Sequence, residues 1–353
     1  MKIQNIQLES LELPYKKPLI TASNQFYTAY GFLVTVSSDN GLEGHGYIDV
    51  FPRTGETIGS ARYAIEEVMK PVLVGKNVED LASLGLLMNR TMIDNRRVKG
   101  GIDIALYDLL AKSFGAPLYV LLGGLAKKEV TIIKMVSLAQ PDEMAQECRE
   151  LLAQGFSALK LKVSGKIEPD LERVAAVRDA VGKDVFIKID SNEAFDAKSA
   201  IRLAAGLAEL GVAIFEQPIS RFHTQAFAEV KNHSSIKIEA DQSASSVHEA
   251  YQLIRKGACD SINTSILKAG GIHAARQIAD MCALTGIECG VSNIAGCMVG
   301  DAAALHLALS APGVSQYCEI GEFEVISDDP FTGMQVVDGK LKVPEGPGLG
   351  VTR

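Results

Sequence analysis

The sequence predicts an α/β protein in which a (β/α)8 barrel of the TIM type is joined to an N-terminal α+β capping domain that the C-terminal tail completes. Eight short runs rich in β-branched residues recur about every 25 residues after residue 129, and each is followed by an amphipathic, alanine-rich segment. The first 118 residues show another pattern, with alternating strands ahead of helices. No glycine-rich nucleotide-binding loop follows any run, which argues against a doubly wound open sheet.

Residues 1–118 are predicted to form the capping domain. Alternation of apolar and polar residues indicates antiparallel strands, and apolar residues spaced three and four apart indicate helices. The predicted strands are 3–13, 31–38 and 44–50. The predicted helices are 55–69, 78–90 and 98–114. Gly115 and Pro117 end the last helix, because neither residue continues one favourably.

Residues 119–322 are predicted to form the barrel, and residues 323–353 a C-terminal segment. The predicted barrel strands are 130–136, 158–163, 185–190, 212–217, 235–240, 260–266, 287–292 and 315–320. The C-terminal segment contains a further hairpin over 334–343, in which Asp338 and Gly339 suit a type I′ turn. We expect this segment to return to the capping domain.

Composition excludes several classes of partner. The formal net charge of -8 comes from 43 acidic and 35 basic residues that are mixed along the chain, so no basic surface for nucleic acid or membrane is expected. No apolar run is long enough for a bilayer, and the N-terminus lacks the apolar core of a signal peptide. The six cysteines form no C-x-x-C pair, which indicates buried, reduced thiols. We expect a cytoplasmic homo-oligomer whose partner is a small molecule.

Polar side chains end an unusual number of the predicted barrel strands. In barrel enzymes of this type, the reactive groups lie at the carboxyl ends of the strands. Residues two apart on a strand point to one face, so both members of each pair are expected at the barrel mouth. The strand-end residues are Lys160 and Lys162, Asp190 and Asn192, Glu216, Glu239 and Asp241, and Glu319.

Asp190, Glu216 and Asp241 are predicted to bind a metal ion. They end three consecutive strands, so their carboxylates are expected to converge and to repel one another without a cation. Oxygen donors without histidine or cysteine favour Mg²⁺, or Mn²⁺, over zinc. The other interpretation is an ordinary set of polar strand ends in water. The common position of all three on successive strands favours the metal site.

Lys160 and Lys162 are candidate catalytic lysines. Two ammonium groups side by side disfavour each other's charge, so we expect one of them to have a lowered pKa. Such a lysine serves as a general base at neutral pH or as a Schiff-base nucleophile. Ion pairs with acidic side chains at the rim are the other interpretation. None of the six histidines ends a strand, so a histidine base is not expected.

Five sequence segments occur in order at barrel spacing. They are GIDIALYDLLAKSFGAPLYVLLGG (101–124), KLK (160–162), KIDSN (188–192), IFEQPI (214–219) and IEADQS (238–243). With them the whole chain resembles the enolase superfamily, in its mandelate racemase and muconate lactonizing group, and most closely the muconate lactonizing branch. The resemblance implies that the capping domain supplies substrate-specificity loops, here around 19–28 and 50–57.

The resemblance also implies a reaction. The shared chemistry is removal of a proton next to a carboxylate, which gives an enolate whose charge Mg²⁺ stabilises. Carried onto this chain, it implies Mg²⁺ on the carboxylates of Asp190, Glu216 and Asp241. It further implies Lys162 as the acid/base and Lys160 as its electrostatic partner.

Residues 261–272 depart from the family pattern where a second base is expected. The sixth barrel strand of the family resembles D-x-I-N-x-K-x-x-K-x-G-G, whose first lysine is the acid/base on the opposite face of the substrate. Without a gap, Ser265 falls on that lysine and Lys268 on the second, usually non-catalytic one. Asn263 and Ser265 share a face, whereas Lys268 has the other parity. We therefore expect this strand to contribute Ser265, and not Lys268, to the site.

The first functional hypothesis is a Mg²⁺-dependent cycloisomerase or dehydratase of a small carboxylate. In it, Lys162 transfers the proton on one face, and Glu319 holds the substrate carboxylate or shares a proton with it. Ser265 hydrogen-bonds the substrate or, because it is small, leaves room for it. Asn192 is expected to support the site or the substrate.

Other functions remain open at this stage. One is an amino-acid or dipeptide epimerase of the same family, in which Lys268 or a water serves the second face. A metal-independent Schiff-base aldolase that uses Lys160 or Lys162 is another. A non-catalytic binding protein is the last, although the three carboxylates and the lysine pair argue against it.

Overall fold

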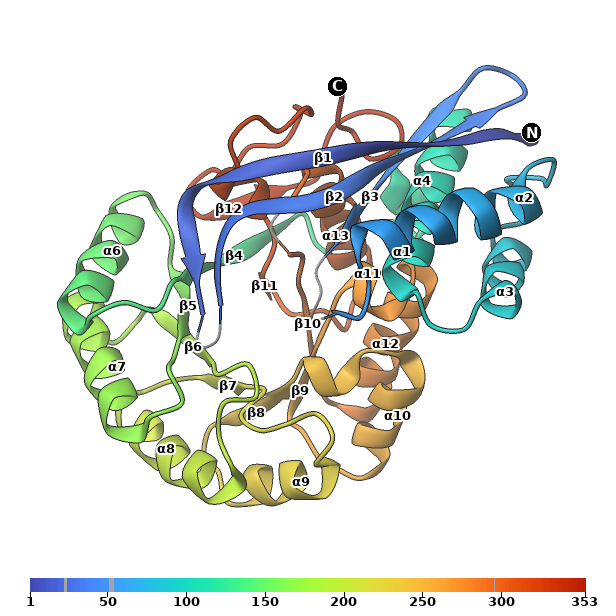
Figure 1. Cartoon of the computed structure of the whole chain (residues 1–353). Coiled ribbons are helices and arrows are strands. Elements are labelled where there is room, and N and C mark those ends of the chain that lie inside the picture. Colours follow the sequence, from blue (N-terminus) through green and yellow to red (C-terminus); the bar gives the residue numbers. More distant parts are fainter. Residues whose placement is uncertain (22–23, 51–53, 295) are drawn as a thin grey trace.

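The computed structural model describes residues 1–21, 24–50, 54–294 and 296–353. It contains a parallel barrel and an antiparallel capping domain, which confirms the predicted fold class (Figure 1). The barrel strands are β4 (Glu129–Val136), β5 (Ala158–Lys162), β6 (Phe186–Asp190), β7 (Ile214–Glu216), β8 (Lys237–Ala240), β9 (Ser261–Thr264), β10 (Glu288–Val291) and β11 (Tyr317–Cys318).

The barrel strands are hydrogen-bonded in the order β10-β9-β8-β7-β6-β5-β4-β11. Isolated bridges from Cys289 to Val314 and from Ser292 to Glu319 join the two ends, so the barrel is nearly closed. Helices cover its outside, and their apolar faces pack on strands that are buried on both sides (Figure 1). These helices are α6 (Pro141–Ala153), α7 (Ile167–Val181), α8 (Ala197–Glu209), α9 (Thr224–Asn232), α10 (Val247–Arg255), α12 (Ile272–Thr285) and α13 (Met298–Ser310).

The capping domain packs a three-stranded antiparallel sheet against helices. Its strands are β1 (Ile3–Ile20), β2 (Gln25–Ser38) and β3 (Glu43–Asp49). Its helices are α1 (Ile58–Tyr63), η2 (Ala64–Met69), α2 (Lys70–Leu73), α3 (Leu81–Thr91), α4 (Arg96–Ser113) and α5 (Leu118–Leu121). A Cβ atom on Gly46 of β3 would lie 1.9 Å from the carbonyl oxygen of Gly101 in α4. Only glycine permits this close contact between the sheet and the helix that leads to the barrel.

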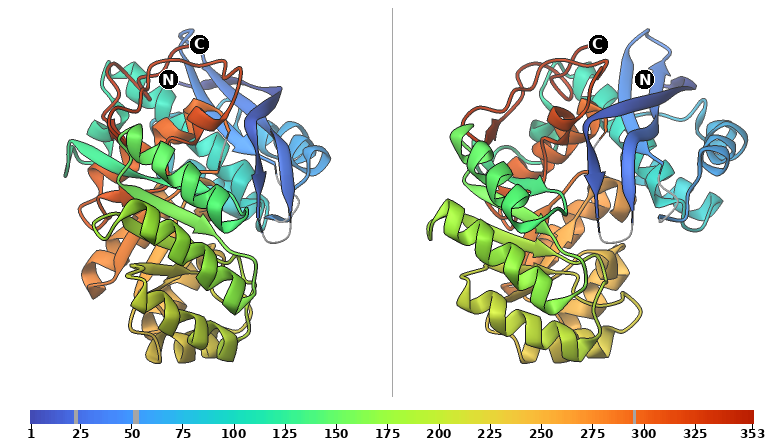
Figure 2. Two further views of the ribbon diagram at one scale, coloured as in Figure 1. Left: turned by 90° about the vertical axis from the view of Figure 1, so that its left-hand side faces the viewer. Right: turned by 60° about the vertical axis from the view of Figure 1, so that its left-hand side comes forward.

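The β1–β2 hairpin is longer than the sequence predicts and extends to the barrel (Figure 2). Pairing resumes beyond the predicted end at residue 13, with Leu19 opposite Phe26 and Ile20 opposite Gln25 after a register shift. The prolines and lysines of this stretch hide the alternation that identifies a strand. The predicted specificity loops fall partly on residues 22–23 and 51–53, which lie outside the described residues.

The C-terminal segment contacts both the barrel and the capping domain. Strand β12 (Lys340–Lys342) pairs antiparallel with β4, so the predicted hairpin is reduced to a single bridge between Val337 and Lys340. Further along, the Leu349 N–H donates to Asp108 Oδ1 of α4 at 2.8 Å. This pairing is possible because β5 pairs with β4 only from Ile133 onward, so the first residues of β4 remain for β12.

Two further expectations from the sequence concern the cysteines and membrane-spanning helices. All six cysteines are buried and unpaired, as predicted. Within the ranges that the structure describes, no helix has both the length and the hydrophobicity needed to cross a membrane.

Candidate active site

A cavity of about 970 Å³ lies at the carboxyl ends of the barrel strands, and the β1–β2 hairpin forms part of its wall. This volume falls within the roughly 300–1,000 Å³ of sites that bind small molecules. Apart from Glu239, for which the expected place at the mouth is wrong, all the residues predicted from the strand ends and from the sixth strand line it. They are Lys160, Lys162, Asp190, Asn192, Glu216, Asp241, Ser265, Lys268 and Glu319.

The parallel register brings the charged strand ends side by side. Lys162 on β5 is the register partner of Asp190 on β6. Asp190 is in turn the partner of Glu216 on β7, and Glu216 of Glu239 on β8. Asp241 follows Glu239 by two residues and so continues toward the same mouth. Neighbouring strands thereby place acids and lysines within ion-pair distance.

Three carboxylates surround the ammonium group of Lys160. Its Nζ lies 3.0 Å from Asp190 Oδ2, 2.7 Å from Glu216 Oε2 and 2.5 Å from Glu319 Oε2. Burial by itself would lower the pKa of Lys160, but the nearby carboxylates outweigh burial and raise that pKa well above its ordinary value. Lys160 is therefore not a lysine with a lowered pKa, because carboxylates surround its ammonium group.

Lys162 has fewer partners than Lys160. Its Nζ donates to Asp190 Oδ2 at 2.5 Å and to Asn192 Oδ1 at 3.0 Å. Asn192 adopts a left-handed backbone conformation with φ 46°, from which its own N–H donates to Asp190 Oδ1 at 2.9 Å. An ammonium group has three N–H donors. The described residues supply two acceptors to Lys162, so one donor remains for a molecule in the cavity.

The Glu319 carboxylate accepts hydrogen bonds from two lysines and one amide inside the barrel. It accepts from Lys160, from Lys188 and, at 2.9 Å, from Asn263 Nδ2. Burial would raise its pKa, but Lys160 and Lys188 lower the pKa of Glu319 to about 2. An ionised carboxylate repels a second one, so these contacts give no support to the predicted role of Glu319 in holding the substrate carboxylate.

The residues predicted to bind a metal end adjacent strands and offer oxygen atoms alone, which suits Mg²⁺. Within the described part of the chain, Glu216 Oε2 is buried and accepts no well-oriented hydrogen bond. The Nζ atoms of Lys160 and Lys188 nevertheless lie 2.7 and 2.8 Å from it. Burial, together with the charges of Asp190 and Glu319, raises the pKa of Glu216 to about 8. A cation beside Glu216 would offset this excess of negative charge, so the residues fit a divalent ion.

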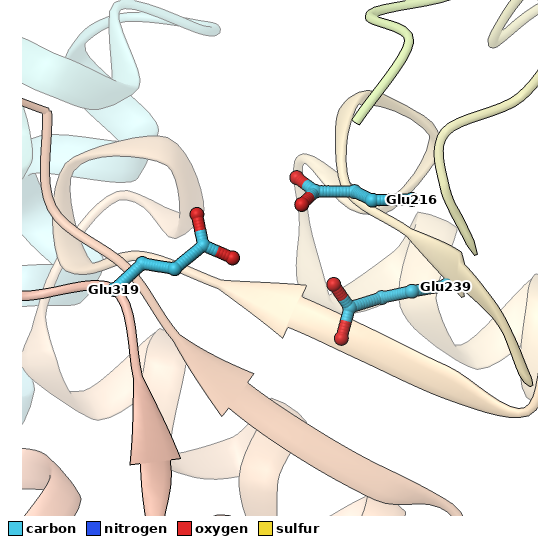
Figure 3. A group of neighbouring side chains, drawn as sticks. All are labelled: Glu216, Glu239 and Glu319. Carbon is cyan, nitrogen blue, oxygen red and sulfur yellow. The ribbon is translucent and has the colours of Figure 1, made fainter. Parts of the chain in front are cut away.

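A second set of carboxylates lies deeper in the barrel (Figure 3). The ligand oxygens of Glu216, Glu239 and Glu319 all lie within 4.8 Å of one another, a spacing that no other group of three acids, histidines or cysteines reaches among the described residues. The predicted trio with Asp190 and Asp241 is thus more widely spaced. Lys188 ion-pairs with all three glutamates, at 2.8 Å to Glu216, so an ammonium group already compensates this second set.

The positions of Ser265 and Lys268 differ from those that the sequence predicts. Strand β9 ends at Thr264, and Ser265 caps the one-turn helix α11 (Ile266–Ala269) by accepting from the Lys268 N–H at 3.2 Å. Because the strand stops here, its alternation no longer governs Lys268. Lys268 lines the same cavity as Ser265 and ion-pairs with the Asp241 carboxylate. The expectation that Lys268 lies off the site is therefore wrong.

Sequence reasoning missed Lys188, Asn263 and Gln217 as site residues. Lys188 stands two residues before Asp190, so strand parity already placed it inside the barrel. Gln217 follows Glu216 with φ 39°, and its Oε1 accepts the N–H groups of Asp241 and Ser243 at 3.0 Å each. It holds the segment that carries Asp241, a role for which the sequence contains no signal.

Two family models match nearly the whole chain. Residues 5–123 match the mandelate racemase / muconate lactonizing enzyme N-terminal domain, and residues 143–353 match the enolase C-terminal domain-like family. Fold and site together define a capped (β/α)8 barrel with a charged mouth. The chain belongs to the enolase superfamily, in its mandelate racemase and muconate lactonizing enzyme group, as the sequence segments indicate.

Relatives within this family carry out different isomerisations. The chain is 31% identical over 361 residues to the hydrophobic dipeptide epimerase of Enterococcus faecalis, with 100% of both chains covered. It is 29% identical over 360 residues to muconate cycloisomerase 1 of Rhodococcus opacus, with 99% of this chain and 96% of that protein covered. The structure of the Enterococcus faecalis dipeptide epimerase with Mg and the dipeptide L-Leu-L-Tyr matches with a TM-score of 0.96 at 30% identity, covering 100% of both chains.

Proposed function

We propose that this protein is a Mg²⁺-dependent enzyme that removes a proton from the carbon next to a substrate carboxylate, with Lys162 as the acid/base. One observation carries the proposal: three lysines line one cavity, but their ammonium groups contact different numbers of oxygen atoms. Lys160 and Lys268 each contact three oxygen acceptors, whereas Lys162 contacts two in the described part of the chain. An ammonium group has three N–H donors, so Lys162 keeps one for substrate, whereas three carboxylates enclose Lys160 and three oxygens accept from Lys268.

The contacts of Lys162 suit proton transfer. Asp190 and Asn192 hold its Nζ at the cavity wall, so the side chain is oriented before substrate arrives. In the neutral form Nζ accepts the proton, and in the ammonium form it returns the proton. Lys160, two residues earlier on the same face, stays positively charged and lies where negative charge develops on the substrate.

Asp190, Glu216 and Asp241 would hold the metal ion. When bound, Mg²⁺ supplies a Lewis acid for the carboxylate oxygens of the substrate. The interior brings together four lysines, Lys160, Lys162, Lys188 and Lys268, and five acids, Asp190, Glu216, Glu239, Asp241 and Glu319. The acids are in excess, which supports the need for a further cation.

A cycloisomerase or dehydratase of a small carboxylate is the first candidate for the overall reaction. On the side of the cavity formed by β9, the Ser265 hydroxyl caps a helix, and all three N–H donors of Lys268 have partners. These partners are the Asp241 carboxylate, the Asp241 carbonyl at 3.0 Å and the Asn263 carbonyl at 2.7 Å. Proton transfer by Lys162 on one face alone suits ring closure or β-elimination, which need no second base.

An epimerase of an amino-acid derivative or dipeptide is the second candidate. Lys268 lines the cavity, and relatives such as the dipeptide epimerase of Enterococcus faecalis carry out this reaction. A divalent cation on Asp241 would compete with Lys268 for the same carboxylate, so metal binding would release Lys268 toward the second face. A Schiff-base aldolase has less support, because the raised pKa of Lys160 keeps it protonated at neutral pH.

Exchange of substrate protons with solvent tests the proposal and separates the two candidates. The Mg²⁺-loaded protein is incubated in D2O with D and L forms of dipeptides and N-succinyl amino acids, and with muconolactone, and deuterium next to the carboxylate is measured by NMR. Exchange of one enantiomer supports one-face chemistry, and exchange of both supports epimerisation. Lys134→Ala is a matched control, because Lys134 is equally buried but does not line the cavity. Undiminished exchange in Lys162→Ala, or with excess EDTA, would refute the proposal.

A further inference from the structure

Lys188 lies in an unusual place for a charged side chain. It stands in the middle of β6 with 2% of its surface exposed, in the interior that barrels of this type fill with branched apolar residues. A buried ammonium group is costly unless it is paired. In this barrel Lys188 ion-pairs with Glu216, Glu239 and Glu319, which come from three different strands or strand ends.

Two sets of carboxylates therefore share one residue. The mouth set consists of Asp190, Glu216 and Asp241, and the inner set of Glu216, Glu239 and Glu319. Within the described residues the inner set has the tighter spacing, with its oxygens within 4.8 Å of one another and pointing to a common centre (Figure 3). Spacing alone would favour a divalent cation at the inner set.

The two sets differ because the ammonium group of Lys188 pairs with every member of the inner set. Each of the three inner carboxylates has Lys188 Nζ as an ion-pair partner. By contrast, no single lysine pairs with all members of the mouth set among the described residues, since Lys160 contacts Asp190 and Glu216 while Lys268 contacts Asp241. A cation at the centre of the inner set would have to displace a fully paired ammonium group.

We propose that Lys188 is a built-in cation that fills the inner carboxylate set, and that it thereby excludes a metal ion from this set and positions Glu216 and Glu319. Glu216 then keeps its place in the mouth set. Glu319 keeps its place beneath Lys160, which it contacts at 2.5 Å. Lys188 is a positioning residue, because it does not line the cavity and acts through its partners. The inference depends on the proposed function in one respect, which is that a metal ion binds the mouth set.

Glu239 completes the arrangement. Its Oε1 accepts from Ser261 Oγ at 3.0 Å and its Oε2 from Lys188, so both oxygens have partners. Glu239 is 2% exposed and does not line the cavity. It belongs to the inner set alone, so changing it separates the two sets experimentally.

Manganese titration followed by electron paramagnetic resonance tests the inference, since bound Mn²⁺ loses the sharp signal of the free ion. Lys188→Met keeps the side-chain length but removes the charge, and we expect it to bind one more Mn²⁺ per chain than the unaltered protein. Lys188→Arg retains a cation and should bind the same number as the unaltered protein. The double variant Lys188→Met/Glu239→Gln should lose the added site, because two carboxylates remain. Lys134→Met removes a buried lysine that ion-pairs with Glu324; it is the matched control and should gain no site.

Glu239→Gln in the presence of Lys188 provides a second test should Lys188→Met fail to fold. We expect its affinity for Mn²⁺ to stay within about threefold of the unaltered protein. A tenfold or greater loss would place the metal at the inner set and overturn the inference, as would a folded Lys188→Met that gains no site. Absence of Mn²⁺ binding to the unaltered protein would instead refute the proposed function, and the added site in Lys188→Met would still be expected.

Discussion

The β5 side of the cavity carries Lys160 and Lys162, whereas the β9 side carries Ser265 and Lys268. Both sides place an amino group in the same cavity. They differ in how many oxygen atoms lie within ion-pair or hydrogen-bond distance of that amino group. On β9, Lys268 donates to three oxygens. On β5, three carboxylate oxygens lie within ion-pair distance of Lys160 Nζ, whereas Lys162 donates to two oxygens among the residues described.

Under the proposed function, the lysine that keeps an unused N–H donor takes part in catalysis, and not every lysine that lines the cavity. A fully paired ammonium group must break contacts before it can act on a substrate, and breaking a buried pair is costly. In the proposed mechanism, Lys160, which lies between carboxylates, serves as a fixed charge. In the same proposed mechanism, Lys162, at the edge of this group of charges, exchanges a proton with the substrate.

The largest expected effect separates the two sides directly. Lys162→Ala should lower deuterium exchange next to the substrate carboxylate by about 10³-fold, in keeping with the loss of a general base. Lys268→Met should lower it by less than about tenfold, because Lys268 acts on Asp241 and not on the substrate. If Lys268→Met instead abolishes exchange of one enantiomer while the other persists, Lys268 is a second base and the enzyme is an epimerase.

Asp241, the proposed metal ligand between the two sides, should show the next largest effect. Asp241→Asn is expected to weaken Mg²⁺ binding by at least about tenfold, since a charged oxygen ligand is lost. Isothermal titration calorimetry on metal-free protein measures the affinity. Glu288→Gln is the control, because Glu288 pairs with Lys237 and does not line the cavity. Equal affinities for both variants would remove Asp241 from the metal site.

A gain of function would sharpen the comparison further. Ser265→Lys places an amino group on the β9 side at the cavity wall, so deuterium exchange should appear, or rise at least about tenfold, for the enantiomer that the unaltered protein exchanges more slowly. Ser265→Met has a similar length without the amine and should show no gain. A folded Ser265→Lys variant without new exchange would mean that the β9 side does not face the substrate carbon opposite Lys162.

The smallest expected effect tests what Ser265 itself does. Its Oγ accepts from the Lys268 N–H at 3.2 Å and caps α11. Loss of such a cap in Ser265→Ala should lower the free energy of unfolding by about 1 kcal/mol, measured by urea denaturation. Exchange should change by less than about threefold, and Ser265→Thr should restore stability. A large loss of exchange at unchanged stability would instead assign the hydroxyl to the substrate.

Much of the fold follows from local patterns in the sequence. Repeated β-branched runs with helices between them predict the barrel, because parallel strands need crossover helices. Side-chain alternation puts Lys160 and Lys162 on one face, and the same rule puts Asp190 at the mouth. These inferences hold because they depend on neighbouring residues within one strand or one βα unit.

Other features depend on where each strand ends and how strands are staggered around the barrel. The sequence by itself determined the barrel, its charged mouth and the departure at Ser265 from the family pattern. Only the tertiary structure decided that β9 stops at Thr264, which brings Lys268 to Asp241. It also decided that Lys188 meets glutamates from three other strands. The physical reason is that periodicity sets the face on which a side chain lies, whereas its contacts across a barrel depend on the stagger of distant strands.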